Sequence, residues 1–139
     1  MKNYDNEVFE KLARVVRSDD KVSERWLVEN GYEEMKHLWD AYDGMEKSFK
    51  WLLNNGFRQL AATVDALNGN DQAKRFLLAS GNRELAAFVE ACTGRQQAVN
   101  WLAKGGYPGW ILVAKEIHVK EKKEAKSIWS IFNLGNPFR

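Results

Sequence analysis

The chain has 139 residues, of which 45% are hydrophobic and 29% charged, a composition typical of one globular domain rather than of a disordered chain. Its 21 basic and 19 acidic residues give a formal net charge of +2, so no overall field favours nucleic acid or an anionic membrane. The N-terminus lacks the apolar core of a signal peptide, and no run of 18 apolar residues is present to span a bilayer. The single cysteine, Cys92, favours a reducing compartment, so we expect a cytoplasmic protein without a membrane partner.

Residues 7–25 resemble a shortened leading unit of a repeat. The segment LARVVRSDDKVSERW at 12–26 echoes LAAFVEACTGRQQAVNW at 85–101 with two residues missing. We expect an N-terminal cap here, because one face of a terminal repeat must meet water instead of a neighbour. Ser18, Asp19 and Asp20 are predicted to end a first helix and to cap a second one.

A 25-residue repeat organises the chain that follows. The segment WLLNNGFRQLAATVDALNGNDQAKR at 51–75 aligns without a gap with FLLASGNRELAAFVEACTGRQQAVN at 76–100. The same frame extends to residues 26–50 and, more loosely, to a unit at 101–126. Self-similarity at such a period is typical of stacked repeats. An aromatic residue opens each unit and a glycine follows five positions later: Trp26, Trp51, Phe76 and Trp101, then Gly31, Gly56, Gly81 and Gly106.

Each unit predicts two short helices. The first crosses the unit boundary and ends near a glycine that can take the left-handed conformation, as at Gly56 and Gly81. The second carries apolar residues at i, i+3, i+4 and i+7, which form one stripe of two turns. The stripes are Met35, Leu38, Trp39 and Tyr42; Leu60, Thr63, Val64 and Leu67; Leu85, Phe88, Val89 and Cys92; and Trp110, Val113, Ala114 and Ile117.

The turns and the aromatic residues also carry predictions. Pairs such as Thr93 and Gln96 resemble a capping box before the first helix of the next unit. Because helices this short are marginal alone, they must be held by stacking. We therefore expect Trp51, Phe76 and Trp101 to be buried between neighbouring units.

The last unit departs from the pattern. Pro108 is predicted to start its second helix, where a missing amide proton costs nothing. That helix is expected to run on to Lys126, past the usual stop. The tail at 127–139, SIWSIFNLGNPFR, is rich in apolar residues and is expected to fold back and close the last unit.

No catalytic or metal-binding constellation is recognised. His37 and His118 lie on different predicted helices with no further ligand at metal-binding spacing, so both are expected to face solvent. Cys92 has no histidine near it in sequence and is expected to be buried in the core. We therefore predict that the chain is not an enzyme and that it needs neither cofactor nor metal.

Two columns of like charge recur in the repeat. One is acidic, with Asp40, Asp65 and Glu90, and one is basic, with Arg25, Lys50 and Arg75. If units stack helix on helix, equivalent residues would lie about 9–10 Å apart. Each column is then a candidate binding stripe, although a solvated row of charges is the simpler interpretation. The tight turns add three further candidates for partner contact: Glu33, Arg58 and Arg83.

A lysine-rich run near the C-terminus is the other basic feature. Lys120, Lys122 and Lys123 could contact a phosphate backbone. Glutamates interleave with them, so a salt-paired exposed helix is the favoured interpretation.

The unit resembles the helix pair of an ankyrin repeat. In LAAFVEACTGRQQAVNWLAKGG at 85–106, an alanine-rich helix, a glycine turn and a second helix ending in aliphatics and glycine follow one another. The chain lacks the Thr-Pro-Leu-His start and the projecting hairpin of that family, and its unit is shorter. The resemblance implies stacked antiparallel helix pairs that bind partners through helix faces or short turns.

We predict an all-α fold, a short right-handed α-solenoid of stacked antiparallel helix pairs in a single domain at 1–139. Its parts are a cap at 7–25, repeats at 26–50, 51–75, 76–100 and 101–126, and a tail at 127–139. The favoured function is a non-catalytic protein-interaction module with an unidentified protein partner. The alternatives are nucleic-acid binding through the basic column and terminal lysines, and a structural unit that self-associates into a homo-oligomer.

Overall fold

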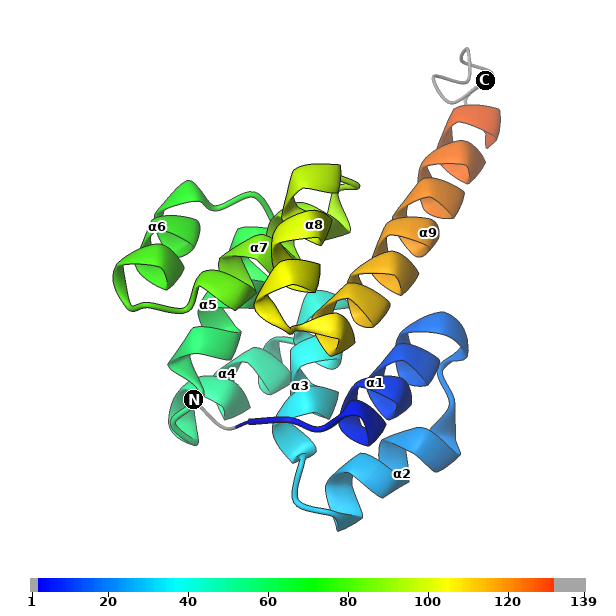
Figure 1. Ribbon diagram of the computed structural model, residues 1–139. Coiled ribbons are helices and arrows are strands. Elements are labelled where there is room, and N and C mark those ends of the chain that lie inside the picture. The colour runs from blue at the N-terminus through cyan, green and yellow to red at the C-terminus, as the bar shows by residue number, and fades with distance from the viewer. Residues whose placement is uncertain (1–2, 132–139) are drawn as a thin grey trace.

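The computed structural model describes residues 3–131, with side chains up to residue 124. Within residues 3–131 it has nine α-helices and no strand, so the predicted all-α class is confirmed (Figure 1). The helices are α1 (Asn6–Ser18), α2 (Lys21–Glu29), α3 (Glu33–Tyr42), α4 (Glu46–Asn54), α5 (Arg58–Leu67), α6 (Asp71–Ala79), α7 (Arg83–Cys92), α8 (Gln96–Gly105) and α9 (Pro108–Ile131).

The 25-residue period sets where the helices begin. From α3 onward, the odd-numbered helices start at Glu33, Arg58, Arg83 and Pro108, each 25 residues after the last. Pro108 is the first helical residue of α9, as predicted. That helix continues through Ile131, beyond the expected end at Lys126, so the first part of the predicted tail is helical. Residues 132–139, where the rest of the tail was expected to fold back, lie outside the described part of the chain.

The odd-numbered helices form a closed ring in the described chain. In this inner ring α1 packs on α3, α3 on α5, α5 on α7 and α7 on α9, and α9 packs on α1 (Figure 1). Within residues 3–131, each of the outer helices α2, α4, α6 and α8 contacts only the inner helices before and after it in the chain. The expectation that one face of the N-terminal cap meets water is therefore wrong, because α1 packs on α9, and the predicted solenoid arrangement is not confirmed.

The contact between α1 and α9 shows how the ring closes. Near the starts of the two helices the ring centroids of Phe9 and Trp110 lie 4.9 Å apart, while Phe9 sits against Gly109. Further along, the Arg17 guanidinium and the Glu116 carboxylate lie 2.8 Å apart. The two helices therefore run in the same direction. Closure buries apolar surface on α1 that an end cap would leave in water.

Ring geometry separates the outer helices. With neighbouring helix axes about 9 Å apart, a ring of five has a radius of about 8 Å. The outer helices then stand about 20 Å from one another. The predicted spacing of 9–10 Å between equivalent residues can therefore hold on the inner helices but not on the outer ones.

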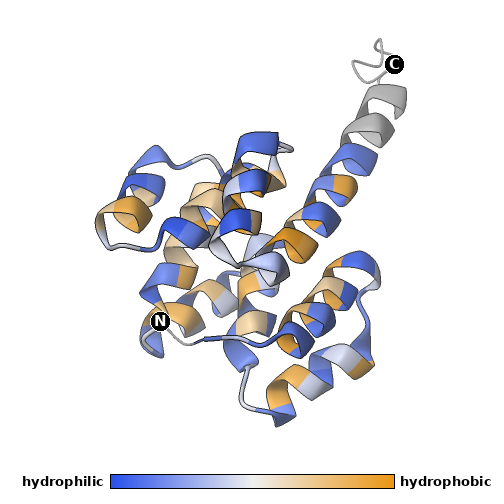
Figure 2. Ribbon diagram, in the orientation of Figure 1, coloured by the Kyte–Doolittle hydropathy of each residue, from blue (hydrophilic) through white to orange (hydrophobic). Residues whose placement is uncertain are grey.

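The core lies where the inner helices meet. The predicted stripes face inward, and Met35, Leu60, Leu85 and Trp110 are all buried. A residual cavity of about 10 Å³ at the ring centre is lined by apolar side chains from the inner helices, among them Leu12, Leu38, Phe88 and Val113. In the coloured part of Figure 2, orange and blue segments alternate along the helices, as expected for amphipathic helices around one core.

The aromatic residues that open the units are less enclosed than expected. Trp51 is half-buried, with its ring stacked 4.2 Å from His37, and Phe76 is also half-buried. Trp101 is 40% exposed and stacks on Tyr107. The prediction of full burial is wrong because these residues lie on outer helices, whose flanks have no neighbouring outer helix to cover them.

Local signals at the helix ends were predicted in part. Gly56 and Gly81 have φ of +84° and +80°, in the left-handed region that favours glycine. The predicted capping box at Thr93 and Gln96 is wrong. Arg95 is the N-cap residue of α8, and Thr93 donates its hydroxyl proton to the Glu90 carbonyl instead. At the start of α6, Asn70 is the capping residue, and its side chain accepts a hydrogen bond from the Ala73 amide.

His37 links α3 to α4 instead of facing solvent as predicted. Its Nδ1 lies 2.9 Å from the hydroxyl of the buried Ser48, and its ring stacks on Trp51. The Glu33 carboxylate lies 3.4 Å from Nε2. Burial lowers the pKa of His37, with a further lowering from Lys36, while Glu33 and Asp40 act in the opposite direction. The lowered pKa favours the neutral imidazole at neutral pH.

Ring closure predicts an unusual response at Gly109. A Cβ built at this residue would lie 2.0 Å from the Phe9 ring, so Gly109→Ala should destabilise the fold by about 1–3 kcal/mol through overpacking. In an open stack the same change in a helix would stabilise by up to about 1 kcal/mol. Urea unfolding measures the difference. In a Phe9→Ala background the penalty of Gly109→Ala should vanish, and a penalty that persists would contradict the closure contact.

His37 predicts a pH dependence of stability. Its pKa is lowered in the folded state, so the folded protein binds fewer protons than the unfolded chain below about pH 6.5. The contribution of His37 to the free energy of unfolding should be complete above that pH and be lost as the pH falls through the lowered pKa. Urea unfolding from pH 7.5 to 5 should show this decrease, and His37→Gln should flatten it. Equal slopes in the two proteins would show that His37 is not responsible.

Candidate functional site

A cleft opens at one end of the ring, where inner helices finish. Residues at the C-terminal ends of α3, α5 and α7, namely Tyr42, Leu67 and Cys92, line it together with Ile117 from the middle of α9. From Ile117, α9 runs on for about 20 Å more and projects beyond the other helices (Figure 1). This overhang forms one wall of a hollow of about 640 Å³, which we call the mouth cleft.

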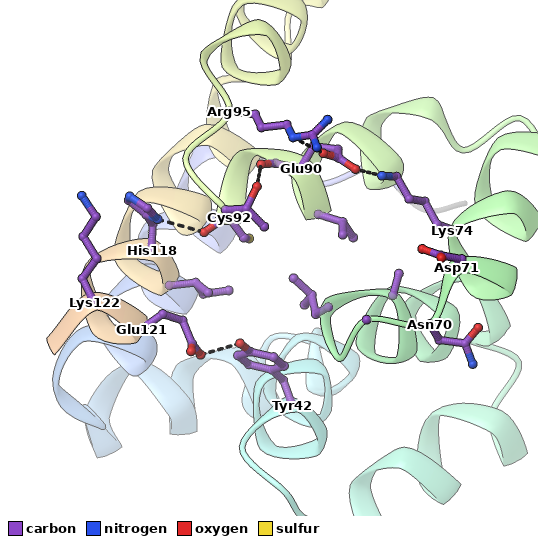
Figure 3. Close-up of a pocket in the computed structure, with 16 residues that line it drawn as sticks. Tyr42, Asn70, Asp71, Lys74, Glu90, Cys92, Arg95, His118, Glu121 and Lys122 are labelled. Atoms are coloured by element: carbon purple, nitrogen blue, oxygen red, sulfur yellow. Dashed lines mark hydrogen bonds and ion pairs between the residues drawn. The ribbon is translucent and has the colours of Figure 1, made fainter. Parts of the chain in front are cut away.

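The mouth cleft combines apolar side chains with charged ones. Its apolar lining includes the stripe residues Leu67, Val89 and Ile117, together with Ala66 beside them. The polar and charged side chains labelled in Figure 3 surround the opening. They come from α3, α6, α7, α9 and the adjoining turns, and are Tyr42, Asn70, Asp71, Lys74, Glu90, Cys92, Arg95, His118, Glu121 and Lys122.

Glu90 joins three parts of the rim. Its carboxylate forms an ion pair with Lys74 of α6 and another with Arg95 in the turn before α8, at 3.0 Å from Arg95 Nε (Figure 3). The Glu90 side chain is only 19% exposed, whereas that of Arg95 is 71% exposed. The negative charge of Glu90 is thus matched by two cations within the structure itself.

Two hydrogen bonds attach the overhang of α9 to the ring. The Tyr42 hydroxyl donates to Glu121 over 2.5 Å, and burial, followed by this bond, raises the pKa of Tyr42. His118 Nδ1 lies 3.1 Å from the Cys92 carbonyl oxygen (Figure 3). The predicted solvent-facing position of His118 is therefore wrong, because the side chain is half-buried over Gly94, where a Cβ would come within 2.8 Å of its ring.

Cys92 is buried as predicted. Burial raises the pKa of its thiol, so the thiol stays protonated and has little nucleophilic character at neutral pH. Within the described residues, no group of three or more histidine, cysteine or acidic side chains is arranged to hold a metal ion. In the same part of the chain, no helix combines the length and apolar character needed to cross a bilayer.

The predicted acidic column is divided by the structure. Glu90 lies in the mouth cleft, but Asp40 and Asp65 are not among its lining residues. Asp40 lies 3.1 Å from Lys36, whose ammonium group also lies 3.6 Å from Glu24 of α2. Lys36 therefore joins the outer helix α2 to the inner helix α3, and Asp40 pairs with it from within α3.

The turn candidates lie at the opposite end of the inner helices. Glu33, Arg58 and Arg83 are the first residues of α3, α5 and α7, about 10 Å along the axis from the acidic column. Arg58 places its guanidinium 5.7 Å from the centre of the Phe76 ring, while Arg83 is exposed. The six predicted partner-binding residues thus do not share one surface.

The predicted basic residues are also dispersed. Arg25, Lys50 and Arg75 are exposed on α2, α4 and α6, the well-separated outer helices. Lys120 donates to the Val16 carbonyl over 3.2 Å and lies 5.0 Å from the centre of the Trp39 ring. Lys122 lines the mouth cleft, and Lys123 lines a separate groove.

Most residues of the mouth cleft could not be selected from the sequence. Tyr42 and Leu67 read as ordinary members of the apolar stripes, and Lys74 meets Glu90 from another repeat unit. The sequence did indicate that the last helix, α9, is longer than its counterparts in the other repeat units. A helix of that length must extend beyond the other helices of a compact ring. That signal identifies a wall but not the side chains that face it.

Comparisons with known proteins identify no relative. No family model matches the chain, and no curated protein or solved structure matches it significantly. The ankyrin-like resemblance of the unit therefore stays a prediction.

The tether between Tyr42 and Glu121 predicts a local effect. Tyr42→Phe removes the hydroxyl and should cost about 1 kcal/mol, with faster amide hydrogen exchange in the part of α9 beyond His118. Hydrogen exchange followed by mass spectrometry measures this effect. Tyr107→Phe, at the other end of the ring, is the matched control and should leave exchange in α9 unchanged. Equal exchange in all three proteins would mean that this bond does not hold the overhang.

Proposed function

We propose that the chain is a non-catalytic protein-interaction module that holds a segment of a partner protein in the mouth cleft. The observation that carries this proposal is the hollow of about 640 Å³ with an apolar lining and a charged rim. Binding surfaces of proteins commonly combine a desolvated apolar centre with a polar border that fixes orientation. A buried, unpaired Cys92 suits a cytoplasmic setting for such a module.

The overhang of α9 favours a protein segment as the occupant. It carries Ile117, His118, Glu121 and Lys122 along one side of the cleft, which offers a peptide segment several side-chain contacts in a row. Tyr42 and His118 hold the base of this wall in place. A partly preformed wall lowers the entropic cost of binding.

The alternatives have less support. Phosphate recognition needs basic side chains along one track, but Arg25, Lys50 and Arg75 are spread over separate outer helices. Self-association needs a continuous apolar patch. The exposed aliphatic residues Val28, Leu53 and Leu78 also lie on different outer helices, about 20 Å apart by the ring geometry.

Site-specific photo-crosslinking tests the proposal. A benzophenone amino acid replaces Lys122, in the wall of the mouth cleft, or Gln97, which is exposed on α8. After irradiation in extract of the native host, position 122 should give a discrete crosslinked protein and position 97 should not. Crosslinks from position 97 alone, or none from position 122, would overturn the proposal.

A further inference from the structure

We infer that a second hollow, at the opposite end of the ring, binds a neutral polyhydroxylated ligand of the size of a mono- or disaccharide. This polar hollow of about 490 Å³ lies where α1, α7 and α9 begin. Among the described residues it shares none of its lining with the mouth cleft. The site is therefore separate from the one in the proposed function, and neither depends on the other.

The repeat is interrupted at the polar hollow. In three units the residue before the inner helix is aromatic, namely Tyr32, Phe57 and Tyr107, and it stacks on the aromatic residue that opens the unit. Asn82 takes this place before α7 and lines the hollow. Departures from a consistent local pattern are expected at functional sites. An amide where the other units have a ring therefore marks this end for binding.

Asn82 is buried but has spare hydrogen-bonding capacity. It is 8% exposed, and its Nδ2 donates to the Ser80 hydroxyl oxygen over 2.9 Å. Its side chain does not cap α7, although asparagine is a preferred capping residue, and no hydrogen bond to its Oδ1 is formed within residues 3–131. An amide oxygen accepts up to two hydrogen bonds. Oδ1 is thus left for a ligand or water.

Donors and further acceptors lie beside this oxygen. The N–H groups in the first turn of a helix have no intrahelical acceptor, and at α7 no N-cap side chain accepts from them. Glu84 in that turn adds a carboxylate, while Asn3 and Asn6 add amides from the N-terminal side of α1. A hydroxyl group both donates and accepts hydrogen bonds. The adjacent hydroxyls of a sugar match this mixture of groups.

The charge of the lining argues against an anionic ligand. Glu84 is the one charged residue in the described lining of the polar hollow. Phosphates and carboxylates are recognised mainly by arginine or lysine, and the described lining contains neither. A neutral ligand rich in hydrogen-bonding groups fits best.

Aromatic rings give the hollow an apolar surface for the carbon–hydrogen face of a sugar. Tyr4 and Tyr107 are half-buried members of the lining. Both rings are held in place, Tyr4 by its hydrogen bond to Glu34 and Tyr107 by stacking on Trp101. Such rings offer a rigid apolar surface with a polar group at the edge. A hollow of about 490 Å³ also lies within the range of small-molecule sites.

Sugar titrations followed by NMR test the inference. The probes are glucose, galactose, mannose and maltose, each added to the isotope-labelled full chain. At least one should cause saturable shifts of the amides of Gly81, Glu84 and Tyr107, while those of Gly69 and Gly94 at the mouth cleft stay unchanged. No saturable shift with any of these sugars, or shifts at the mouth cleft instead, would overturn the inference.

Variants at Asn82 then assign the site. Asn82→Tyr restores the residue type of Tyr32 and Tyr107, so urea unfolding should show a stable fold while sugar binding is lost. Asn82→Ala removes the amide alone and should weaken binding by about five- to tenfold, as expected for one hydrogen bond. Asn54→Ala, at an exposed position outside the hollow, is the matched control and should bind like wild type. Equal binding by all four proteins would overturn the inference.

A phosphorylated probe tests the choice of a neutral ligand. The 6-phosphate of the sugar that binds best should bind more weakly, because the described lining offers Glu84 and no cation. Equal or tighter binding of the phosphate would overturn that choice. The crosslink from position 122 lies at the other end of the ring and should persist in Asn82→Tyr, so each proposal can fail without the other.

Discussion

The contact of Phe9 with Gly109 is the interaction on which the rest of the structure depends. Without a side chain at Gly109, α9 can approach α1 closely, and Phe9 packs against Trp110 in the space. An open row of helix pairs would leave an apolar stripe exposed at each end. Here the two terminal inner helices cover each other, so every inner helix has an inner neighbour on both sides.

Closure also separates the roles of the two sets of helices. The inner helices are crowded around one core, and their equivalent residues can act together. The outer helices splay apart, so a repeated residue on them, such as Lys50 or Leu53, has no counterpart within contact distance. The same repeat in sequence therefore yields a shared surface at the end of the ring and only isolated features around its circumference.

The sequence predicted what is local and periodic. Helix starts, the inward stripes and the positive φ of Gly56 follow from spacing and backbone sterics, which act within a few residues. Closure could not be predicted, because Phe9 and Gly109 lie far apart in the chain and no periodic pattern states whether a stack bends until its ends meet. The exposure of Trp101 follows from its place on an outer helix, and His118 is half-buried because α9 packs on the end of α7; both depend on how helices from different units meet, which the local pattern does not state.

The two ends of the ring differ in a way that points to the mouth cleft. At the end where the inner helices begin, Tyr4 packs on Phe9 and Tyr32 and donates its hydroxyl proton to the buried Glu34. A hollow remains there, but Glu84 is the one charged residue in its described lining. At the other end no such strap crosses the helix termini within residues 3–131, and α9 rises beside the opening instead of covering it. Three carboxylates, Asp71, Glu90 and Glu121, lie in the lining with three cations, Lys74, Arg95 and Lys122, so this end offers a rim of balanced charge around an apolar floor, which the opposite end lacks.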